Sequence, residues 1–507
     1  MSTDRVAPSP IEPVPGGTSE RLAGPRPVVP DGLFGELESD GVPVTTDATT
    51  RAAMGRDWWP LSIGWAARGS VPAEPAIVAR PTAVEHVAAV LRRCHEARVP
   101  VTPTAGGSGV CGGSVPVFGG VSLDLTGLAG LRELDEESLL ADVGAGTFGP
   151  ALEAALGGVG SGYTFGHWPQ SMDISTVGGW IACRGAGQYS TRYGKIEDLV
   201  VGLEVVLADG TVVRTDGVAP RAATGPNLTQ LFLGSEGTLG VVTAARLRVT
   251  PTPEANASRA LGFPSFAAGL DAGRRILRRG ATPAVLRLYD ENESRRNFDT
   301  ETCVMVLFDE ADPVLLDATM TVCDEECGGV ERLDDGLVAR WLHERNDTSA
   351  LGPLWKNNIV VDTIEVAGRW SVLTVLAVDV VATLTGIEGT LAASVHESHA
   401  YGDGACLYFT FGGRRPDRGD GDDDAEIAWQ ESYYRRAWDA ATECVLGHGA
   451  AISHHHGIGL NRGRFLAEAL GPGFAVLQSV KDALDPRGIL NPGKLGLASP
   501  FGPAPWP

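Results

Sequence analysis

Hydrophobic and polar positions follow a regular pattern between residues 76 and 109. The run AIVARP, which begins at Ala76, is typical of a short strand. Apolar residues at positions 84, 87, 88, 90 and 91 then predict an amphipathic helix, because this spacing places them on one helical face. The next run, PVTPTAGGSG, reads as a strand that leads directly into glycine. Together the three segments predict a βαβ-like unit that ends at a glycine-rich turn.

Short β-branched segments follow as far as Pro251, and the dipeptide Asp209-Gly210 between two of them is a hairpin signal. Beyond residue 251, strands such as AVLRLYD and CVMVLFD alternate with longer helical segments. The pattern predicts an α+β fold with more than one domain, since 507 residues exceed the size of a single hydrophobic core. We expect a Pro-rich disordered arm at residues 1–30 and a helical lead-in at 31–72. A first α+β domain should follow at 73–251, a second mixed domain at 252–440 and a C-terminal segment at 441–499.

Composition and charge argue against several classes of partner. The chain has 41 Lys and Arg residues against 63 Asp and Glu residues, and the resulting formal charge of −22 disfavours nucleic acid as a partner. The longest apolar run, Val372 to Ile387, is interrupted by Asp379; it is shorter than a membrane span and predicts a buried helix. We expect no transmembrane segment and no secretory signal, and the eight scattered cysteines favour a reducing compartment such as the cytoplasm.

The glycine-rich turn is the first candidate binding element. In TAGGSGVCGGS, residues 104–114, consecutive backbone N–H groups can converge into a nest that holds a pyrophosphate without a basic side chain. No Lys-Ser or Lys-Thr follows the glycines, so the turn differs from a nucleotide P-loop, and a plain glycine-rich turn stays an alternative. The candidate residues are Thr104, Ala105, Gly106, Gly107, Ser108 and Gly109.

Three further motifs follow in order: DISTVGGW from Asp173, YGKIEDLV from Tyr193 and LFLGSEGTLGVVT from Leu231. From about Ala76 to Pro251, the sequence resembles the PCMH-type FAD-binding domains of the vanillyl-alcohol oxidase superfamily. The resemblance implies FAD, with its pyrophosphate on the glycine turn, its isoalloxazine beside the DISTVGGW motif and nucleotide contacts at the SEG tripeptide. The residues so implied are Asp173, Ser175, Thr176, Gly178, Gly179, Glu236 and Gly237.

Covalent attachment of this cofactor is not expected. Some members of the family link FAD through a histidine in the glycine turn, whereas Ser108 occupies the matching region here and no histidine lies between His95 and His167. Cys111 and Cys183 leave one alternative open, since a thiolate can attack the flavin ring.

The C-terminal run DPRGILNPGK resembles that of FAD-linked oxidases of the glycolate and D-lactate type. The resemblance implies that residues 252–440 form an FAD-linked oxidase C-terminal (cap) domain, that residues 441–499 complete the flavin site, and that Lys494 approaches the cofactor. A cation there would stabilise negative charge as electrons enter the flavin. A solvent-exposed lysine is the alternative.

Three consecutive histidines occupy positions 454–456 in SHHHGIG. Imidazoles have pKa values near neutrality, so they can donate to a phosphate or carboxylate and move a proton beside a flavin. Side chains of consecutive residues project in different directions, which argues against a metal site. The motif resembles the His-His-His-Gly-x-Gly of alkyldihydroxyacetonephosphate synthases, whereas D-lactate and glycolate oxidoreductases usually carry Glu-His-Gly-x-Gly.

Two other segments, PAVLRLYD and CLYFTF, resemble those that carry an essential arginine and a catalytic tyrosine in the same synthases. The catalytic residues implied by the resemblance are Arg287, Tyr408, His454, His455 and His456. From the residues alone, Arg287 in a structural ion pair and Tyr408 as an ordinary strand aromatic stay alternatives.

The resemblance implies a transferase of ether-lipid synthesis, which exchanges the acyl group of acyl-dihydroxyacetone phosphate for a fatty alcohol through a flavin adduct. Arg287 would bind the phosphate, and Tyr408 and the histidines would move protons. The NPGK motif and Thr410 depart from the synthase pattern, so an FAD-linked oxidoreductase of a 2-hydroxy acid or small alcohol is the alternative. The expected partner is a small-molecule or lipid-like phosphate; a homodimer and contact with a membrane surface are left open.

Overall fold

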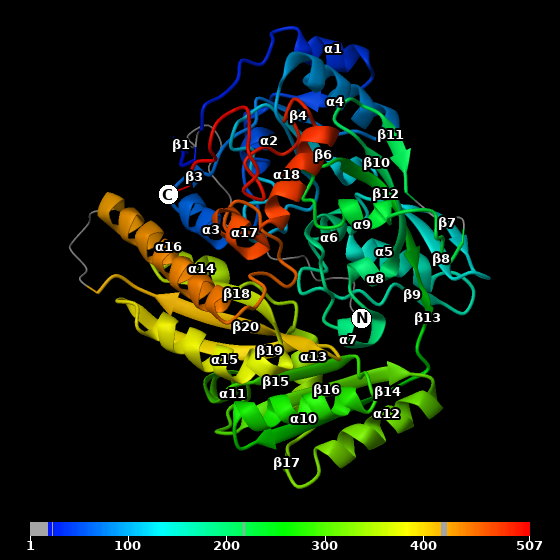
Figure 1. Ribbon diagram of the computed structural model, residues 1–507, viewed down its shortest axis with the longest axis vertical. Helices are drawn as coiled ribbons and strands as arrows, with labels where there is room; N and C mark the ends of the chain where they lie inside the picture. The colour runs from blue at the N-terminus through cyan, green and yellow to red at the C-terminus, as the bar shows by residue number, and fades with distance from the viewer. Residues whose placement is uncertain (1–18, 23, 216–218, 417–422, 507) are drawn as a thin grey trace.

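The protein is described by a computed structural model over residues 19–22, 24–215, 219–416 and 423–506. In Figure 1 the N-terminal half, blue to green, lies above a large sheet coloured green to orange, and the C-terminal segment returns to the upper half. Residues 1–18 of the predicted Pro-rich arm lie outside the described ranges. Helices and sheets are mixed, as the α+β prediction requires, and no helix in the described ranges has the length and apolar character to cross a membrane.

The upper half contains a four-stranded sheet in the order β2-β4-β6-β5. Its strands are Val44–Thr45 (β2), Ile77–Ala79 (β4), Val101–Thr104 (β5) and Val121–Asp124 (β6). Strands β4 and β5 both pair in parallel with β6, and helix α4, Val84–Ala97, connects them. The helix buries Val87, Val90 and Leu91, because its apolar residues recur every three or four positions. The predicted βαβ-like unit is confirmed, and the glycine-rich turn follows β5.

A five-stranded antiparallel sheet, in the order β11-β10-β12-β8-β7, forms the other part of the upper half. Its strands are Leu131–Asp135 (β7), Leu140–Gly144 (β8), Val200–Val206 (β10), Val212–Arg214 (β11) and Val241–Arg248 (β12). Gly210, with a φ of 86°, makes the tight turn between β10 and β11, so the predicted hairpin is confirmed. Helices α5, Gly149–Gly157, and α6, Val177–Cys183, pack on this sheet.

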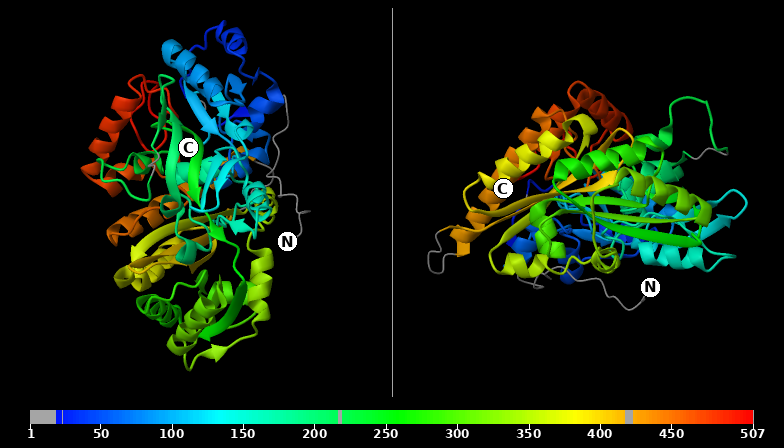
Figure 2. Two further views of the ribbon diagram at one scale, coloured as in Figure 1. Left: turned by 90° about the vertical axis from the view of Figure 1, so that its right-hand side faces the viewer. Right: turned by 90° about the horizontal axis from the view of Figure 1, so that it is seen from below.

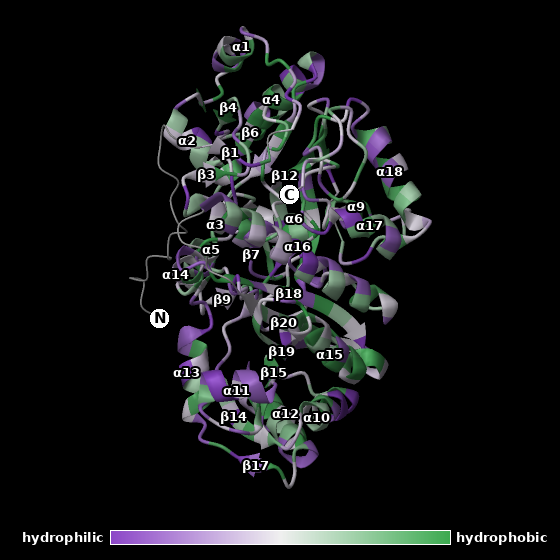
Figure 3. Cartoon of the chain, turned by 90° about the vertical axis from the view of Figure 1, so that its left-hand side faces the viewer, coloured by the Kyte–Doolittle hydropathy of each residue, from purple (hydrophilic) through white to green (hydrophobic). Residues whose placement is uncertain are grey.

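The lower half is built on a seven-stranded antiparallel sheet in the order β17-β14-β16-β15-β19-β20-β18. Its strands are Ala255–Phe263 (β14), Val285–Tyr289 (β15), Cys303–Ala311 (β16), Glu331–Arg332 (β17), Val360–Arg369 (β18), Thr390–Ala400 (β19) and Gly404–Gly413 (β20). One face is covered by helices Phe266–Arg278 (α10), Pro313–Glu326 (α12), Trp370–Thr385 (α15) and Asp423–Gly447 (α16). The other face carries α11, Glu291–Phe298, and α13, Gly336–Glu344, and α11 is strongly hydrophilic (Figure 3).

Helix α15 contains the long apolar run of the sequence. The predicted helix is present, but it is buried along one face only. Leu373, Leu376 and Val380 enter the core against the sheet, whereas the side chains of Val375 and Val378 are 54% and 64% exposed. The run is apolar on both faces, so its helical period alone could not show which face would meet solvent.

The two halves lie one above the other in the left view of Figure 2, and α7, Ser190–Tyr193, contacts strands β15 and β19 of the lower half. Arg192 forms an ion pair of 2.9 Å with the buried Asp309, and the hydroxyl of Tyr193 donates to Glu310 at 2.7 Å. The lead-in segment also bridges the halves, since its helix α3, Pro60–Ala66, packs on α14, Leu351–Lys356. Helix α16 runs through residue 440, and the predicted domain boundaries stay predictions.

The C-terminal segment returns to the upper half through helices α17, Gly463–Leu470, and α18, Gly473–Leu484 (Figure 1). Leu490 then forms a parallel bridge with Val101 of β5. The side chain of Asn491 donates to the backbone carbonyls of Gly113, at 2.9 Å, and Glu236, at 2.7 Å. Residues close to the C-terminus therefore hold the glycine-rich turn in place.

Candidate functional site

A cavity of about 980 Å³ lies between the glycine-rich turn and the open face of the seven-stranded sheet. This volume is near the upper end of the range for small-molecule sites, about 300–1,000 Å³. The predicted site residues that line it are Thr104, Ala105, Gly106, Gly107, Ser108, Gly109, Ser175, Thr176, Gly178, Gly179, Glu236, Gly237, Arg287, Tyr408, His455 and His456. Asp173, His454 and Lys494 are not among the lining residues.

Glycines give the upper wall of the cavity its shape. A Cβ atom on Gly106 would lie 2.1 Å from the carbonyl oxygen of Ile174, and one on Gly178 would lie 2.9 Å from the Cβ of Ala145. Gly107 has a φ of 62°, in the left-handed region that favours glycine. The residues therefore fit a cradle of backbone N–H groups for a pyrophosphate, as FAD requires.

Glu236 binds the backbone of the loop that follows the three histidines. The carboxylate of this half-buried residue accepts hydrogen bonds from the backbone N–H groups of Ile458, at 2.6 Å, and Gly459, at 2.8 Å. Burial raises the pKa of Glu236, and these two hydrogen bonds oppose that rise. The side chain therefore ties the motif LGSEGTLG to SHHHGIG, two stretches that are 220 residues apart.

Lys494 is fully buried, so the alternative of a solvent-exposed lysine is wrong. Its Nζ donates to the carbonyl oxygen of Val115 at 2.7 Å, behind the glycine-rich turn. Burial lowers the pKa of Lys494 to about 7, although the charges of Asp57 and Glu236 oppose the shift. Burial raises the pKa of Asp57 to about 7 as well. The lysine supports the turn from behind and does not itself face the cavity.

A row of paired side chains crosses the seven-stranded sheet on the face that borders the cavity. The register pairs Glu365 of β18 with Tyr408 of β20, Tyr408 with His396 of β19, and His396 with Tyr289 of β15. Directly paired residues of neighbouring strands point to the same face, which here is the cavity face. The imidazole of His396 stacks on Tyr408, with ring centroids 4.8 Å apart, and lies 5.2 Å from the ring of Tyr289.

Glu365 anchors the histidine loop to this row. Its carboxylate accepts from the backbone N–H groups of His454, at 2.6 Å, and His456, at 2.8 Å. The buried guanidinium of Arg462 donates to the same carboxylate at 3.0 Å. Although burial opposes ionisation, the charge of Arg462 and the surrounding donors hold the pKa of Glu365 well below its usual range. The loop is therefore fixed by an ionised, fully buried acid.

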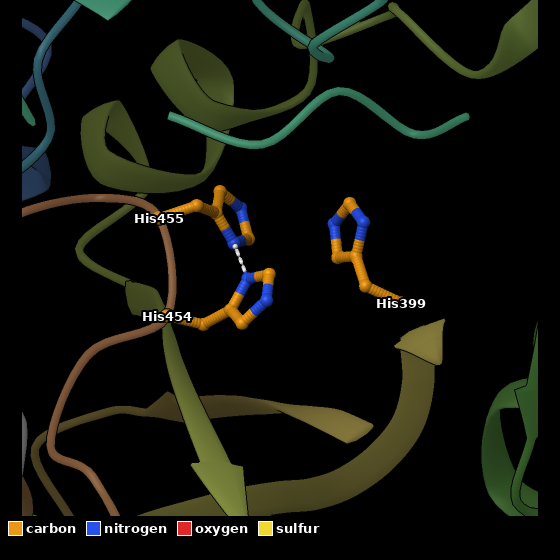
Figure 4. Close-up of side chains that lie close together, drawn as sticks. All are labelled: His399, His454 and His455. Atoms are coloured by element: carbon orange, nitrogen blue, oxygen red, sulfur yellow. Dashed lines mark hydrogen bonds between the residues drawn. The ribbon is translucent and has the colours of Figure 1, made fainter. Parts of the chain in front are cut away.

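The histidines form a connected network (Figure 4). Nδ1 of His454 and Nδ1 of His455 are 2.9 Å apart, and Nε2 of His454 lies 2.9 Å from the hydroxyl of Tyr401. The ring of His399 stacks on that of His454, and nitrogens of His399, His454 and His455 lie within 4.8 Å of one another. Both nitrogens of His454 have hydrogen-bond partners, which suits proton transfer better than metal binding.

Burial sets the charge of these rings. It lowers the pKa of His454 and of His455 to about 3 and that of His456 to about 4. The imidazoles are therefore neutral near pH 7 and able to accept a proton. Nε2 of His456 lies 3.4 Å from the hydroxyl of Tyr408, whose pKa burial raises well above its usual value. Near neutral pH the phenol therefore keeps its proton, and the histidine rings are uncharged.

Two arginines face the cavity beside the row. Arg287 lies 5.5 Å from the ring centroid of Tyr289 and 5.6 Å from that of Trp341. Arg345 lies 5.9 Å from the same Trp341 ring and 4.7 Å from that of Tyr189. Nε of Arg287 and Nη1 of Arg345 are buried and have no hydrogen-bond partner within the described chain. Buried donors of this kind fit an anionic ligand.

The cysteines on the cavity wall are poor nucleophiles. Cys111 and Cys183 both line the cavity. Burial raises the pKa of Cys183 to about 12 and that of Cys111 well above its usual value. Because the thiolate is the reactive form, neither side chain is prepared to attack a flavin at neutral pH.

Several residues at the site were missed from the sequence: Asp57, His396, His399, Tyr401, Arg345, Glu365 and Arg462. His396 could have been found, since strand alternation in ASVHESHAY places it on the same face as Ser394. Glu365 and Arg462 carry no local signal, because their roles depend on pairing between distant segments. Arg345 follows a helix with no motif around it.

Comparison with known proteins agrees with this architecture. Residues 75–216 match the family described as FAD binding domain, and residues 252–495 match FAD linked oxidases, C-terminal domain. An uncharacterized FAD-linked oxidoreductase, YgcU of Escherichia coli O157:H7, is 30% identical over 449 residues, which cover 83% of this chain and 89% of YgcU. The alkyldihydroxyacetonephosphate synthase of Dictyostelium discoideum is 28% identical, over 84% of this chain and 74% of the synthase.

A solved structure of an alkyldihydroxyacetonephosphate synthase has the same fold. Its TM-score is 0.75 at 24% identity, and the match covers 96% of this chain and 90% of the synthase. Glycolate oxidase subunit GlcD of Bacillus subtilis is 28% identical over 83% of this chain and 89% of its own length. The relatives thus include a synthase, an FAD-linked oxidoreductase and an oxidase subunit.

Proposed function

Because the chain belongs to the FAD-linked oxidase family, with an FAD binding domain followed by an FAD linked oxidase C-terminal domain, we propose that it catalyses the reaction of the alkyldihydroxyacetonephosphate synthases. This reaction replaces the acyl group of acyl-dihydroxyacetone phosphate by a fatty alcohol. The observation that carries the proposal is that the neutral rings of His455 and His456 line one cavity together with two arginines.

FAD is the cofactor, and when bound it supplies an electrophilic ring beside the substrate. We propose that the backbone of residues 104–109 holds the pyrophosphate and that residues 175–179 contact the ring. The raised pKa values of Cys111 and Cys183 support non-covalent binding. Denaturing the purified protein and passing it through a desalting column tests this point. Yellow colour that stays with the protein contradicts it.

The side chains of the lower half would bind the substrate and move its protons. Arg287 and Arg345 hold the phosphate, because their buried N–H groups are otherwise without acceptors. His455 or His456 takes the proton from the activated carbon, since both rings are neutral and line the cavity. Tyr408 donates a proton to the departing acid. His454 orients His455 and lies outside the cavity wall.

The test is an exchange assay with acyl-dihydroxyacetone phosphate and a radiolabelled fatty alcohol. Label recovered in an ether-linked product supports the proposal. Variant His455→Ala should abolish recovery and keep FAD, while His86→Ala, at a half-buried histidine of the upper half outside the cavity wall, serves as the control. No labelled product from the wild type would reject the proposal.

The second candidate is oxidation of a 2-hydroxy acid, which the names of the relatives YgcU and GlcD favour. Anaerobic addition of D-lactate separates the two candidates. Lasting bleaching of the flavin absorbance contradicts a synthase without net redox change, and an unchanged spectrum counts against an oxidase of that acid. Cytoplasmic location and a homodimer stay predictions.

A further inference from the structure

His396 is a buried histidine at the centre of the sheet row that the proposed chemistry leaves without a role. Its ring lines the cavity and is 6% exposed. Nε2 lies 2.6 Å from Nη2 of Arg287, and Nδ1 lies 2.8 Å from Oε2 of Glu293. Both ring nitrogens are therefore engaged, one with a cation and the other with a carboxylate.

The direction of these hydrogen bonds follows from the chemistry of the partners. A guanidinium only donates, so Nε2 of His396 must accept from Arg287 and carries no proton. The ring proton of the neutral imidazole then lies on Nδ1, and the carboxylate of Glu293 accepts it. Only one tautomer satisfies both contacts.

Glu293 is itself held in one orientation. Its Oε1 accepts from the hydroxyl of Ser394 at 2.9 Å and from that of Thr410 at 3.1 Å. Although burial opposes ionisation, contact with His396 holds the pKa of Glu293 at about 2. Burial lowers the pKa of His396, and the charge of Arg287 adds to this shift, although the carboxylate of Glu293 opposes it. The pair therefore consists of an ionised acid and a neutral imidazole.

Arg287 depends on this pair for its orientation. The aromatic rings of Tyr289 and Trp341 contact the guanidinium, but ring contacts do not fix which N–H points where. The bond from Nη2 to His396 does fix it, and it leaves the buried Nε as a donor without a partner in the described chain. An arginine held in this way loses less side-chain entropy when it binds an anion.

We propose that Glu293 and His396 are positioning residues, which lock one imidazole tautomer and thereby orient Arg287 toward the anionic group of the substrate. The anion is a phosphate or a carboxylate, the two groups that match a guanidinium. This inference rests on the proposed function only in that Arg287 binds substrate. It adds a reason why Thr410, and not an aromatic residue, stands beside Glu293.

The experiment measures binding of inorganic phosphate to the FAD-loaded protein by calorimetry, in parallel with D-lactate as a carboxylate. His396→Leu should weaken binding about tenfold, the loss of one charge-assisted hydrogen bond. His396→Gln offers an acceptor to Arg287 and a donor to Glu293, so it should restore affinity to within about threefold of the wild type. The matched control is His448→Leu. It removes the contact between His448 and Asp379, whose atoms Nε2 and Oδ2 are 2.9 Å apart, and neither residue lines the cavity.

A second readout reports the tautomer directly. In ¹⁵N-histidine spectra, assigned by difference with His396→Gln, Nδ1 should carry the proton and Nε2 should not. A proton on Nε2, a His396→Leu variant with unchanged affinity for both anions, or a wild type that binds neither anion would overturn the proposal. If D-lactate binds more tightly than phosphate, the anionic group that Arg287 binds in the substrate is a carboxylate. If anion binding depends on His396 but the protein shows no acyl exchange, the synthase function is rejected and the positioning role of His396 is supported.

Discussion

Glu365 shows how a single side chain holds the histidine loop in place. It has no exposed surface, and it bonds at once to two backbone N–H groups of the histidine loop and to Arg462. A buried charge is costly unless it is fully compensated, and here the partners supply the compensation. Removing the charge from one partner leaves the other uncompensated.

We expect Glu365→Gln to destabilise the protein by about 3 kcal/mol, because Arg462 would stay buried without its counter-charge. The folded state depresses the pKa of Glu365, so this contribution is present above the ordinary value of 4.5 and is lost as pH falls further. Urea unfolding at pH 7 measures the change, with the exposed Glu137→Gln as control. Equal midpoints for the two variants would contradict the expectation.

A variant of Tyr408 tests whether its phenol is the proton donor. Tyr408→Phe should lower kcat for acyl exchange by a factor of about 100 or more, because the phenol is the group that keeps its proton at neutral pH. The flavin absorbance should be unchanged. Tyr433→Phe is the matched control, since that hydroxyl contacts Thr390 away from the cavity. Full activity in Tyr408→Phe would mean that Tyr408 is an ordinary strand aromatic with no role in proton transfer.

Local motifs predicted the glycine-rich wall of the cavity, but they missed His396 and Arg345, which also line it, and the supporting residues Glu365 and Arg462. The histidine triplet and the glycine turn are continuous in sequence, so their composition is visible without the fold. Glu365, His396 and Arg462 reach the site through strand register and a returning C-terminal loop. No spacing rule connects partners that are about 100 residues apart.

At the scale of elements, the best prediction concerned the segment with the strongest period. Helix α4 and its two flanking strands lie where the pattern placed them. Helix α15 was harder, because a helix apolar on both faces does not show which face meets solvent. The order of the seven-stranded sheet could not be read from the sequence, since it pairs strands that are up to about 110 residues apart.

The turn after β5 gives the prediction at this scale. Gly106→Ala should yield a folded protein without bound FAD, because the new Cβ would lie 2.1 Å from the carbonyl oxygen of Ile174 and push the turn out of its cradle. The ratio of flavin to protein absorbance measures occupancy, and far-UV circular dichroism checks the fold. Gly157→Ala, with open space around its Cβ, is the control. Normal FAD content in Gly106→Ala would exclude this turn from the cofactor site.

At the scale of the whole molecule, the cavity proposed for FAD lies between two halves that share hydrophobic as well as polar contacts. A ligand that binds only the folded state stabilises it by about 2.7 kcal/mol at 100 times its Kd. We therefore expect removal of FAD to lower the Tm, and added FAD to restore it in a concentration-dependent way. Scanning calorimetry measures the shift, with riboflavin, which lacks the pyrophosphate, as control. A Tm independent of FAD would mean that the cavity wall does not hold the cofactor.

The tie between Asn491 and the glycine-rich turn has a consequence for protein synthesis. The turn emerges from the ribosome early, at residues 104–114, yet Gly113 and Glu236 receive their hydrogen bonds from Asn491. At bacterial or eukaryotic elongation rates, the 387 residues between positions 104 and 491 take roughly 20 to 80 s to translate. We therefore expect the glycine-rich turn to reach its final geometry, and to hold a cofactor firmly, only after residue 491 has been translated.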